Sequence, residues 1–160
     1  MNTAFLAAPL RKIFDHYHAS NQRYRHLAFS SKDFALLPDI TITIKSCLPN
    51  YQVWDGNQPI AQSPSVDCSR FDFIQKTFAQ PEGLIIVQPD YWFRHWSLLD
   101  VQAFWSALST RSGGQNVIVV FAQSNEFSHI NQHYFLPSEL QGTAITLWVS
   151  SKAPLSSQDG

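Results

Sequence analysis

One stretch of the sequence decides the fold: GLIIVQPDYWFRHW, residues 83–96. Its first half is a continuous apolar run between a glycine and a proline, which is typical of a short strand buried on both faces of a parallel sheet. In open α/β sheets, ligands and partners are met beyond the carboxyl ends of such strands. The run leads into Asp90 and a cluster of aromatic residues, so we expect the functional surface of the protein to lie here.

The residues that follow alternate between apolar runs and helical patterns. Strands are predicted over 84–88, 116–122 and 144–150, and a short helix over 125–135. A longer helix is predicted to begin after Ser97, whose hydroxyl can cap it, and to end at the glycine pair 113–114. Its buried stripe is predicted to be Leu98, Val101, Trp105 and Leu108. This order predicts an α/β fold in three layers, with a mostly parallel sheet of about five strands and helices on both faces.

The first half carries weaker patterns. In chain order they predict a helix over 4–22, a strand over 26–30, a brief helix that begins in a capping pattern at 30–33 and ends at Leu37, a strand over 39–45, a strand over 51–54, a surface loop over 57–68 and a helix around 69–78. The strand over 39–45 is inferred from isoleucines at every second position, which predict one buried face.

Composition limits the class of protein. A chain of 160 residues fits one domain, which we place at 1–150, with a Ser-rich disordered tail over 151–160. No run is long enough to span a membrane, and the apolar residues near the start do not form a secretory signal, so a soluble cytoplasmic protein is expected. The net charge of −1 argues against a strong sequence-independent grip on nucleic acid.

Metal and nucleophile motifs are absent or incomplete. Cys47 and Cys68 have no partner at ligand spacing, which makes a zinc site or a disulfide framework a poor fit. His129 and His133 have the spacing of a two-histidine metal face, but the run lacks the glutamate of a metalloprotease motif, and a solvated helix edge is favoured. We therefore predict no catalytic residue and no cofactor.

The aromatic cluster supplies the candidate interface. The chain is poor in charged residues and rich in aromatic ones, 14% of each, a balance that suits a protein whose surface is partly covered by a partner. Tryptophan, tyrosine and arginine carry much of the binding energy of interfaces. The candidate interface residues are Tyr91, Trp92, Phe93, Arg94, His95 and Trp96. The alternative is that these rings pack in the core of the protein.

A second candidate site is polar. Asp90 follows a buried strand, a position from which carboxylates bind metals or act as bases in α/β enzymes. Asn125 and Glu126 follow the next predicted strand, a position that would allow their side chains to converge on Asp90. The alternative is that Asp90 belongs to an ordinary turn with the proline before it.

The order of elements over residues 26–150 resembles the core of RecA/AAA-type P-loop nucleotidases. In this resemblance, residues 84–90 lie at the acidic Walker B strand, and residues 116–121 with the polar tip 123–125 at the sensor strand. The family's GxxxxGK[ST] phosphate loop is missing, because its place holds SSKDFALLP, residues 30–38, with one lysine, no glycine and an aspartate that repels phosphate. The resemblance implies a degenerate member that has lost its nucleotide and acts as a structural or regulatory subunit.

These observations predict a non-catalytic interaction or scaffold subunit of a larger cytoplasmic assembly, which docks through the aromatic loop 89–96. Its partner is another protein or a second copy of the chain. Two alternatives stay open: a nucleotide- or metal-dependent enzyme that uses Asp90, and a protein that binds single-stranded nucleic acid by stacking its rings on bases.

Overall fold

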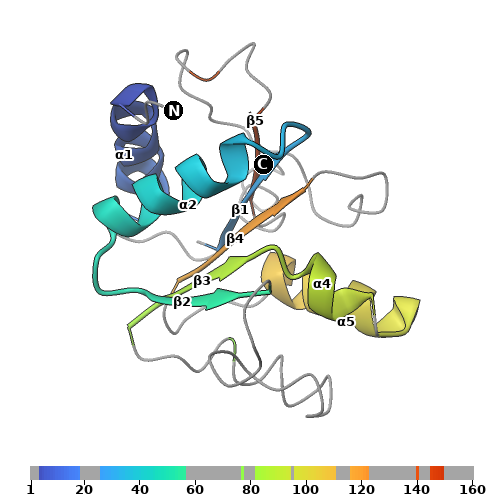
Figure 1. Cartoon of the computed structure of the whole chain (residues 1–160). Coiled ribbons are helices and arrows are strands. Elements are labelled where there is room, and N and C mark those ends of the chain that lie inside the picture. Colours follow the sequence, from blue (N-terminus) through green and yellow to red (C-terminus); the bar gives the residue numbers. More distant parts are fainter. Residues whose placement is uncertain are drawn as a thin grey trace, which may run out of the picture.

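The computed structural model describes residues 4–18, 26–56, 77, 82–94, 96–110, 116–122, 140 and 145–149. Within them, five strands form one sheet in the order β2-β3-β4-β1-β5 (Figure 1). The strands are β1 (Leu27–Ser31), β2 (Gln52–Asp55), β3 (Leu84–Val87), β4 (Val117–Ala122) and β5 (Ile145–Val149). The predicted α/β class is confirmed, and both strands of the first half join the same sheet as the later ones.

Helices cover both faces of this sheet (Figure 1). The helices α1 (Ala4–His18) and α2 (Leu36–Cys47) lie on one face, and α4 (Asp90–Phe93) and α5 (Leu98–Thr110) lie on the other. The strands alternate accordingly: in β4, Ile118 and Val120 belong to the cluster under α1 and α2, whereas Val119 and Phe121 belong to the cluster under α4 and α5. The sheet therefore separates two apolar cores.

The sheet is mostly parallel, as predicted, with one antiparallel strand at its edge. The strands β1, β2, β3 and β4 are parallel to their neighbours, but β5 runs antiparallel to β1. The apolar pattern of β5 predicted a strand without giving its direction, since an antiparallel edge strand on a mostly parallel sheet has the same residue pattern.

The strand predicted over 39–45 is wrong, because these residues belong to the helix α2. Ile40 and Ile44 are fully buried, whereas Ile42 between them is 59% exposed. Positions four apart share one face of a helix, so isoleucine at every second position fits a helix as well as a strand. The hydroxyls of Thr41 and Thr43 donate to the carbonyl oxygens four residues earlier, at 2.9 and 2.8 Å.

The start of α2 also differs from the predicted capping pattern. The two serines at 30 and 31 are the last residues of β1 and are fully buried, and the helix begins only at Leu36. Asp33 makes the local turn instead, since its Oδ1 accepts a hydrogen bond from the N–H of Ala35 at 3.0 Å. The brief helix through Leu37 is thus the first turn of a longer one.

The predicted start of α5 is confirmed. The Ser97 hydroxyl oxygen accepts a hydrogen bond from the backbone N–H of Asp100 at 3.1 Å, and the helix runs from Leu98 to Thr110. This is the geometry of a side-chain N-cap, which satisfies an N–H that has no partner inside the helix.

We expect Ser97→Ala to lower the free energy of unfolding by about 1 kcal/mol, because the cap bond is lost. Urea denaturation followed by far-UV circular dichroism measures the change. Ser97→Asp keeps an acceptor at the same place and serves as the control. Equal losses in both variants would show that the hydroxyl does not act as a cap.

Several predicted segments lie outside the described residues. These are residues 19–22 of the first helix, the loop 57–68, the helix around 69–78 except Thr77, the helix 125–135 and the tail 151–160. In the part of the chain that is described, no helix is both long and apolar enough to cross a membrane.

Candidate functional site

The chain leaves β3 through a tight turn at the carboxyl edge of the sheet. Gln88 has a φ of 48°, in the left-handed region that side chains other than glycine rarely adopt. Its N–H donates to the carbonyl oxygen of Val120 in β4 at 2.7 Å, while the N–H of Gly56 donates to the carbonyl oxygen of Val87 at 2.8 Å. A Cβ at Gly56 would overlap the carbonyl oxygen of Gln88. The absence of a side chain at Gly56 thus lets the end of β2 approach this turn.

Immediately after the turn, three of the predicted interface rings enter the core. Trp92, Phe93 and Trp96 are all buried in the cluster under α4 and α5. The ring centroid of Phe93 lies 4.7 Å from that of Trp96, 5.1 Å from that of Phe104 and 6.1 Å from that of Trp105. The expectation that these rings form an exposed docking loop is therefore wrong for these three residues.

The short helix α4 explains which rings are inside. Trp92 and Phe93 are the last two residues of α4 and both face the core, and Trp96, which follows the helix, donates its backbone N–H to the carbonyl oxygen of Phe93 at 3.0 Å. Tyr91, on the other side of α4, and Arg94, its C-cap residue, are both exposed. The sequence alone does not separate the two sides, because the buried side of this segment follows from where the short helix begins and ends.

Of the predicted interface residues that the structure describes, Tyr91 and Arg94 are exposed at the surface. The guanidinium carbon of Arg94, the C-cap residue of α4, lies 4.6 Å from the centre of the Tyr91 ring, which is a cation–π contact. Tyr91 is 41% exposed despite this contact. His95, the remaining candidate, lies outside the described residues.

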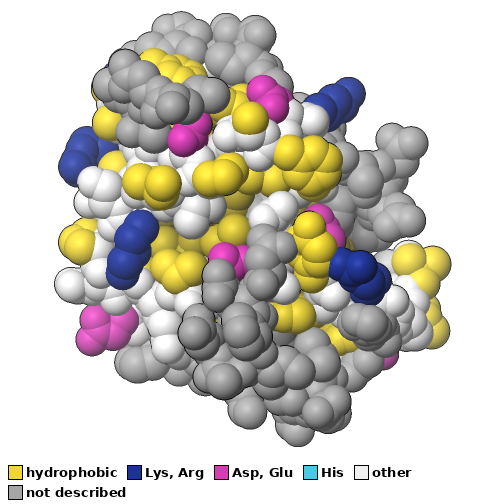
Figure 2. All heavy atoms as spheres, in the orientation of Figure 1, with side chains coloured by type: hydrophobic (Ala, Val, Ile, Leu, Met, Phe, Trp, Pro, Cys, Tyr) yellow, Lys and Arg dark blue, Asp and Glu magenta, His cyan; other side chains and the backbone are white. Residues whose placement is uncertain are grey.

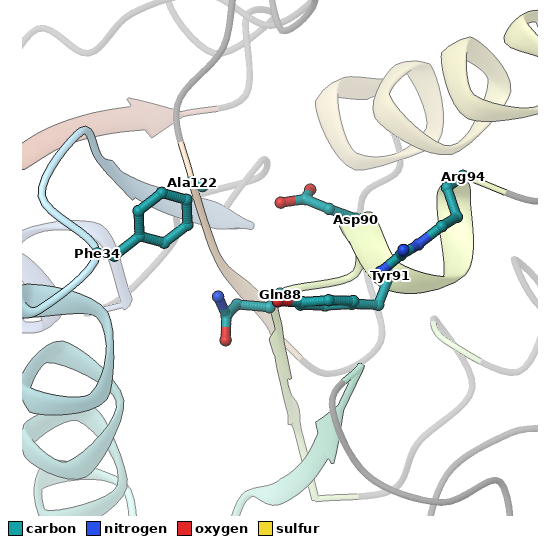
Figure 3. A pocket seen from close by; sticks show the side chains of 6 residues that line it. All are labelled: Phe34, Gln88, Asp90, Tyr91, Arg94 and Ala122. Carbon is teal, nitrogen blue, oxygen red and sulfur yellow. The ribbon is translucent and has the colours of Figure 1, made fainter.

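A pocket of about 350 Å³ opens beside these two residues, at the carboxyl ends of β1, β3 and β4. It is lined by Phe34, Gln88, Asp90, Tyr91, Arg94 and Ala122. In Figure 3 the Phe34 ring stands on one side of the space, on the connection between β1 and α2. The side chains of Asp90 and Gln88 extend toward that space from the opposite side. Phe34 is 65% exposed, so much of the aromatic wall is open to solvent.

Asp90 lines this pocket from the start of α4, shortly after the end of β3. Asp90 is half-buried and begins the first turn of α4. Its expected companions, Asn125 and Glu126, lie outside the described residues, as do His129 and His133. Among the residues that are described, no three acidic, histidine or cysteine side chains lie close enough together to hold a metal ion.

The connection between β1 and α2 does not fit a nucleotide phosphate. A phosphate loop presents several backbone N–H groups to the ligand. Here the N–H of Asp33 donates to Ser31 Oγ, that of Ala35 to Asp33 Oδ1, and that of Leu36 to the carbonyl oxygen of Asp33, all at 3.0 Å. The Asp33 carboxylate occupies the middle of this turn. These N–H groups are used within the turn, and the turn carries a negative charge.

Two exposed leucines follow the aromatic segment. Leu98 and Leu99, the first residues of α5, are 62% and 76% exposed. The sequence pattern predicts Leu98 in the buried stripe of this helix, and that prediction is wrong.

On the face of the molecule in Figure 2, the hydrophobic side chains of the described residues are interspersed with single charged ones. No continuous basic surface lies on the described part of that face.

Burial raises the pKa of the Cys47 thiol above its ordinary value; the Arg11 guanidinium opposes this rise and the Asp15 carboxylate adds to it. The thiolate is the reactive form, so we expect Cys47 to react with iodoacetamide more slowly than a small free thiol at neutral pH. Folding therefore favours the neutral thiol. The stability linked to this preference is fully present below the ordinary thiol pKa, and it is lost as the pH rises through the raised pKa of the folded protein.

The labelling rate is measured by mass spectrometry between pH 7 and pH 10 in the Cys68→Ser background, with glutathione as the reference thiol. A Cys47 rate at neutral pH equal to that of glutathione would contradict the expectation.

Comparisons with protein-family models, with curated proteins and with solved structures found no match to this chain.

Proposed function

We propose that this protein is a non-catalytic interaction subunit that docks a partner protein on the corner formed by α4 and the start of α5. The docking residues are Tyr91, Arg94, Leu98 and Leu99. The observation that carries the proposal is the pair of leucines, because two adjacent and largely exposed leucines lie directly after the tightly packed aromatic segment. This corner replaces the wider aromatic loop, three of whose rings are in the core.

The chemistry of the corner supports a protein partner. Tyrosine and arginine are enriched among residues that dominate binding energy, and apolar side chains around them exclude water. The Arg94 side chain lies over the Tyr91 ring, so less conformational freedom is lost when a partner covers it. Beneath these residues, the contacts of Phe93 with Trp96 and Phe104 give the corner a rigid base.

The proposal includes the resemblance to a degenerate P-loop nucleotidase. The strand order supports it: β3, at the Walker B position, pairs with β4, at the sensor position, and β4 pairs with β1. Asp90 and the connection after β1 consequently meet at one pocket. The poor fit of that connection to phosphate supports a member that serves an assembly rather than hydrolysing a nucleotide.

Site-specific crosslinking tests the docking corner. A photoreactive phenylalanine analogue is placed at Leu99 in one variant and at Ile42 in another, and the adducts formed in the producing cells are identified by mass spectrometry. Ile42 is a matched control, since it is 59% exposed and lies on α2, across the sheet. We expect an adduct with one protein, or with a second copy of the chain, from position 99 and not from position 42.

The double variant Leu98→Ser/Leu99→Ser then tests whether the leucines carry the binding. It should abolish copurification of the crosslinked partner, while Ile42→Ser leaves it unchanged. Circular dichroism checks that both variants are folded. Identical adducts from positions 99 and 42, or a partner retained by the double variant, would refute the docking corner.

A further inference from the structure

We propose that the pocket between Phe34 and Asp90 binds a guanine base. This site is separate from the leucine pair of the docking corner and calls for no phosphate loop. The volume of about 350 Å³ is within the range of sites that take small organic ligands. The pocket also lies at the carboxyl ends of parallel strands, where ligands of open α/β sheets bind.

Phe34 provides the stacking surface. It is the more exposed of the two aromatic residues that line the pocket, and Figure 3 shows its ring turned toward the space between β4 and α4. Stacking of a base on an aromatic ring is favourable for every base, since each has a flat π face. Phe34 therefore supplies affinity for a planar heterocycle without choosing among bases.

Asp90 determines which base the pocket prefers. Its carboxylate extends toward the same space from the opposite wall (Figure 3). An ionised carboxylate only accepts hydrogen bonds, and each of its oxygens carries lone pairs for more than one donor. The Oδ1 atom of Asp90 is fully buried, so a ligand meets this carboxylate through its other oxygen. Guanine presents two adjacent donors, N1–H and the N2 amino group, which can share that single oxygen, because they lie side by side on one edge of the base. Adenine presents one amino group beside an acceptor nitrogen, which a carboxylate repels.

The remaining polar residues are consistent with this occupant. The amide of Gln88 both donates and accepts, so it can meet the O6 and N7 edge that guanine presents. Arg94, over Tyr91 at the edge of the pocket, can attract a phosphate attached to the base. The protein as a whole has a net charge of −1, so recognition through the base suits it better than recognition through a phosphate backbone.

Isothermal titration calorimetry with GMP and AMP tests the site on the full chain. We expect GMP to bind at least about tenfold more tightly than AMP, because the unmatched carboxylate penalises adenine. Asp90→Asn should remove this preference. Phe34→Ala should weaken binding of both nucleotides by about tenfold or more, and Phe5→Ala, an exposed phenylalanine on α1, should leave it unchanged.

Two sources of the base are separated by a second arm. A short single-stranded RNA of alternating guanosine and uridine is titrated beside GMP, and an adenosine–uridine RNA serves as its control. Tighter binding of the guanosine RNA than of GMP indicates a base within a strand, and the reverse indicates a free nucleotide. Either result requires the preference for guanine.

The proposal is overturned if no nucleotide binds at millimolar concentration, if GMP and AMP bind equally, or if Phe34→Ala leaves binding unchanged. The Leu98→Ser/Leu99→Ser variant should bind GMP like the unmodified protein. Failure of the base site and failure of the docking corner are therefore distinguishable.

Discussion

Phe93→Ala is expected to lower the free energy of unfolding by about 3–5 kcal/mol, the usual cost of truncating a buried phenylalanine. Phe93 is 7% exposed, and its ring contacts those of Trp96, Phe104 and Trp105. Truncation would leave a cavity between rings that are already held in position by their neighbours. Such a loss is a large part of the stability of a typical domain, so partial unfolding at ambient temperature is expected.

Tyr91→Ala is the matched control, because it removes an aromatic ring from the exposed side of the same helix. We expect it to change the stability by less than about 1 kcal/mol. Chemical denaturation followed by tryptophan fluorescence measures both variants. Similar small losses in the two variants would mean that the aromatic segment is not part of the core.

Gly56→Ala is expected to lower the free energy of unfolding by more than about 2 kcal/mol, since steric strain at a tightly packed backbone is among the more damaging changes. The added Cβ would overlap the carbonyl oxygen of Gln88. Because the obstacle is backbone, it cannot rotate away as the end of a flexible side chain would. The end of β2 must separate from β3, and the hydrogen bond from Gly56 N–H to Val87 is lost.

Gly83→Ala serves as a comparison, because the atoms nearest to its added Cβ belong to a side chain and not to the backbone. Its Cβ would lie 2.6 Å from a ring carbon of Tyr51, and Gly83 has a φ of 94°. Thermal unfolding by differential scanning calorimetry ranks the two variants. An unchanged transition temperature for Gly56→Ala would contradict the close approach of β2 to the Gln88 turn.

The sequence identifies the elements best where one pattern admits one structure. The apolar runs of β3 and β4 are short and bounded by turn residues, so they were predicted close to their actual ends. The run over 39–45 failed because its period of two places Ile40 and Ile44 on one face of a helix too. The surrounding core, which covers Ile40 and Ile44 and leaves Ile42 outside, decides between the two structures.

The candidate site was predicted in part. The position of Asp90 after a buried strand was enough to place it at the carboxyl edge. Phe34 was missed, because nothing in the local sequence indicates that a residue between β1 and α2 faces one that follows β3. That meeting depends on the order β3-β4-β1 within the sheet. The three core rings were assigned to the surface because composition alone does not distinguish an aromatic core from an aromatic interface.

Among the residues that the structure describes, the two apolar clusters on opposite sides of the sheet have no member in common. Energetic effects of substitutions add when the sites share no contacts. Truncating Ile40 on one side and Phe104 on the other should therefore give a double variant whose destabilisation equals the sum of the single ones. Two truncations within the aromatic cluster should instead deviate from additivity. The stability of the molecule can therefore be changed separately on the two sides of the sheet, and substitutions in the cluster beneath α1 and α2 should leave the proposed docking corner undisturbed.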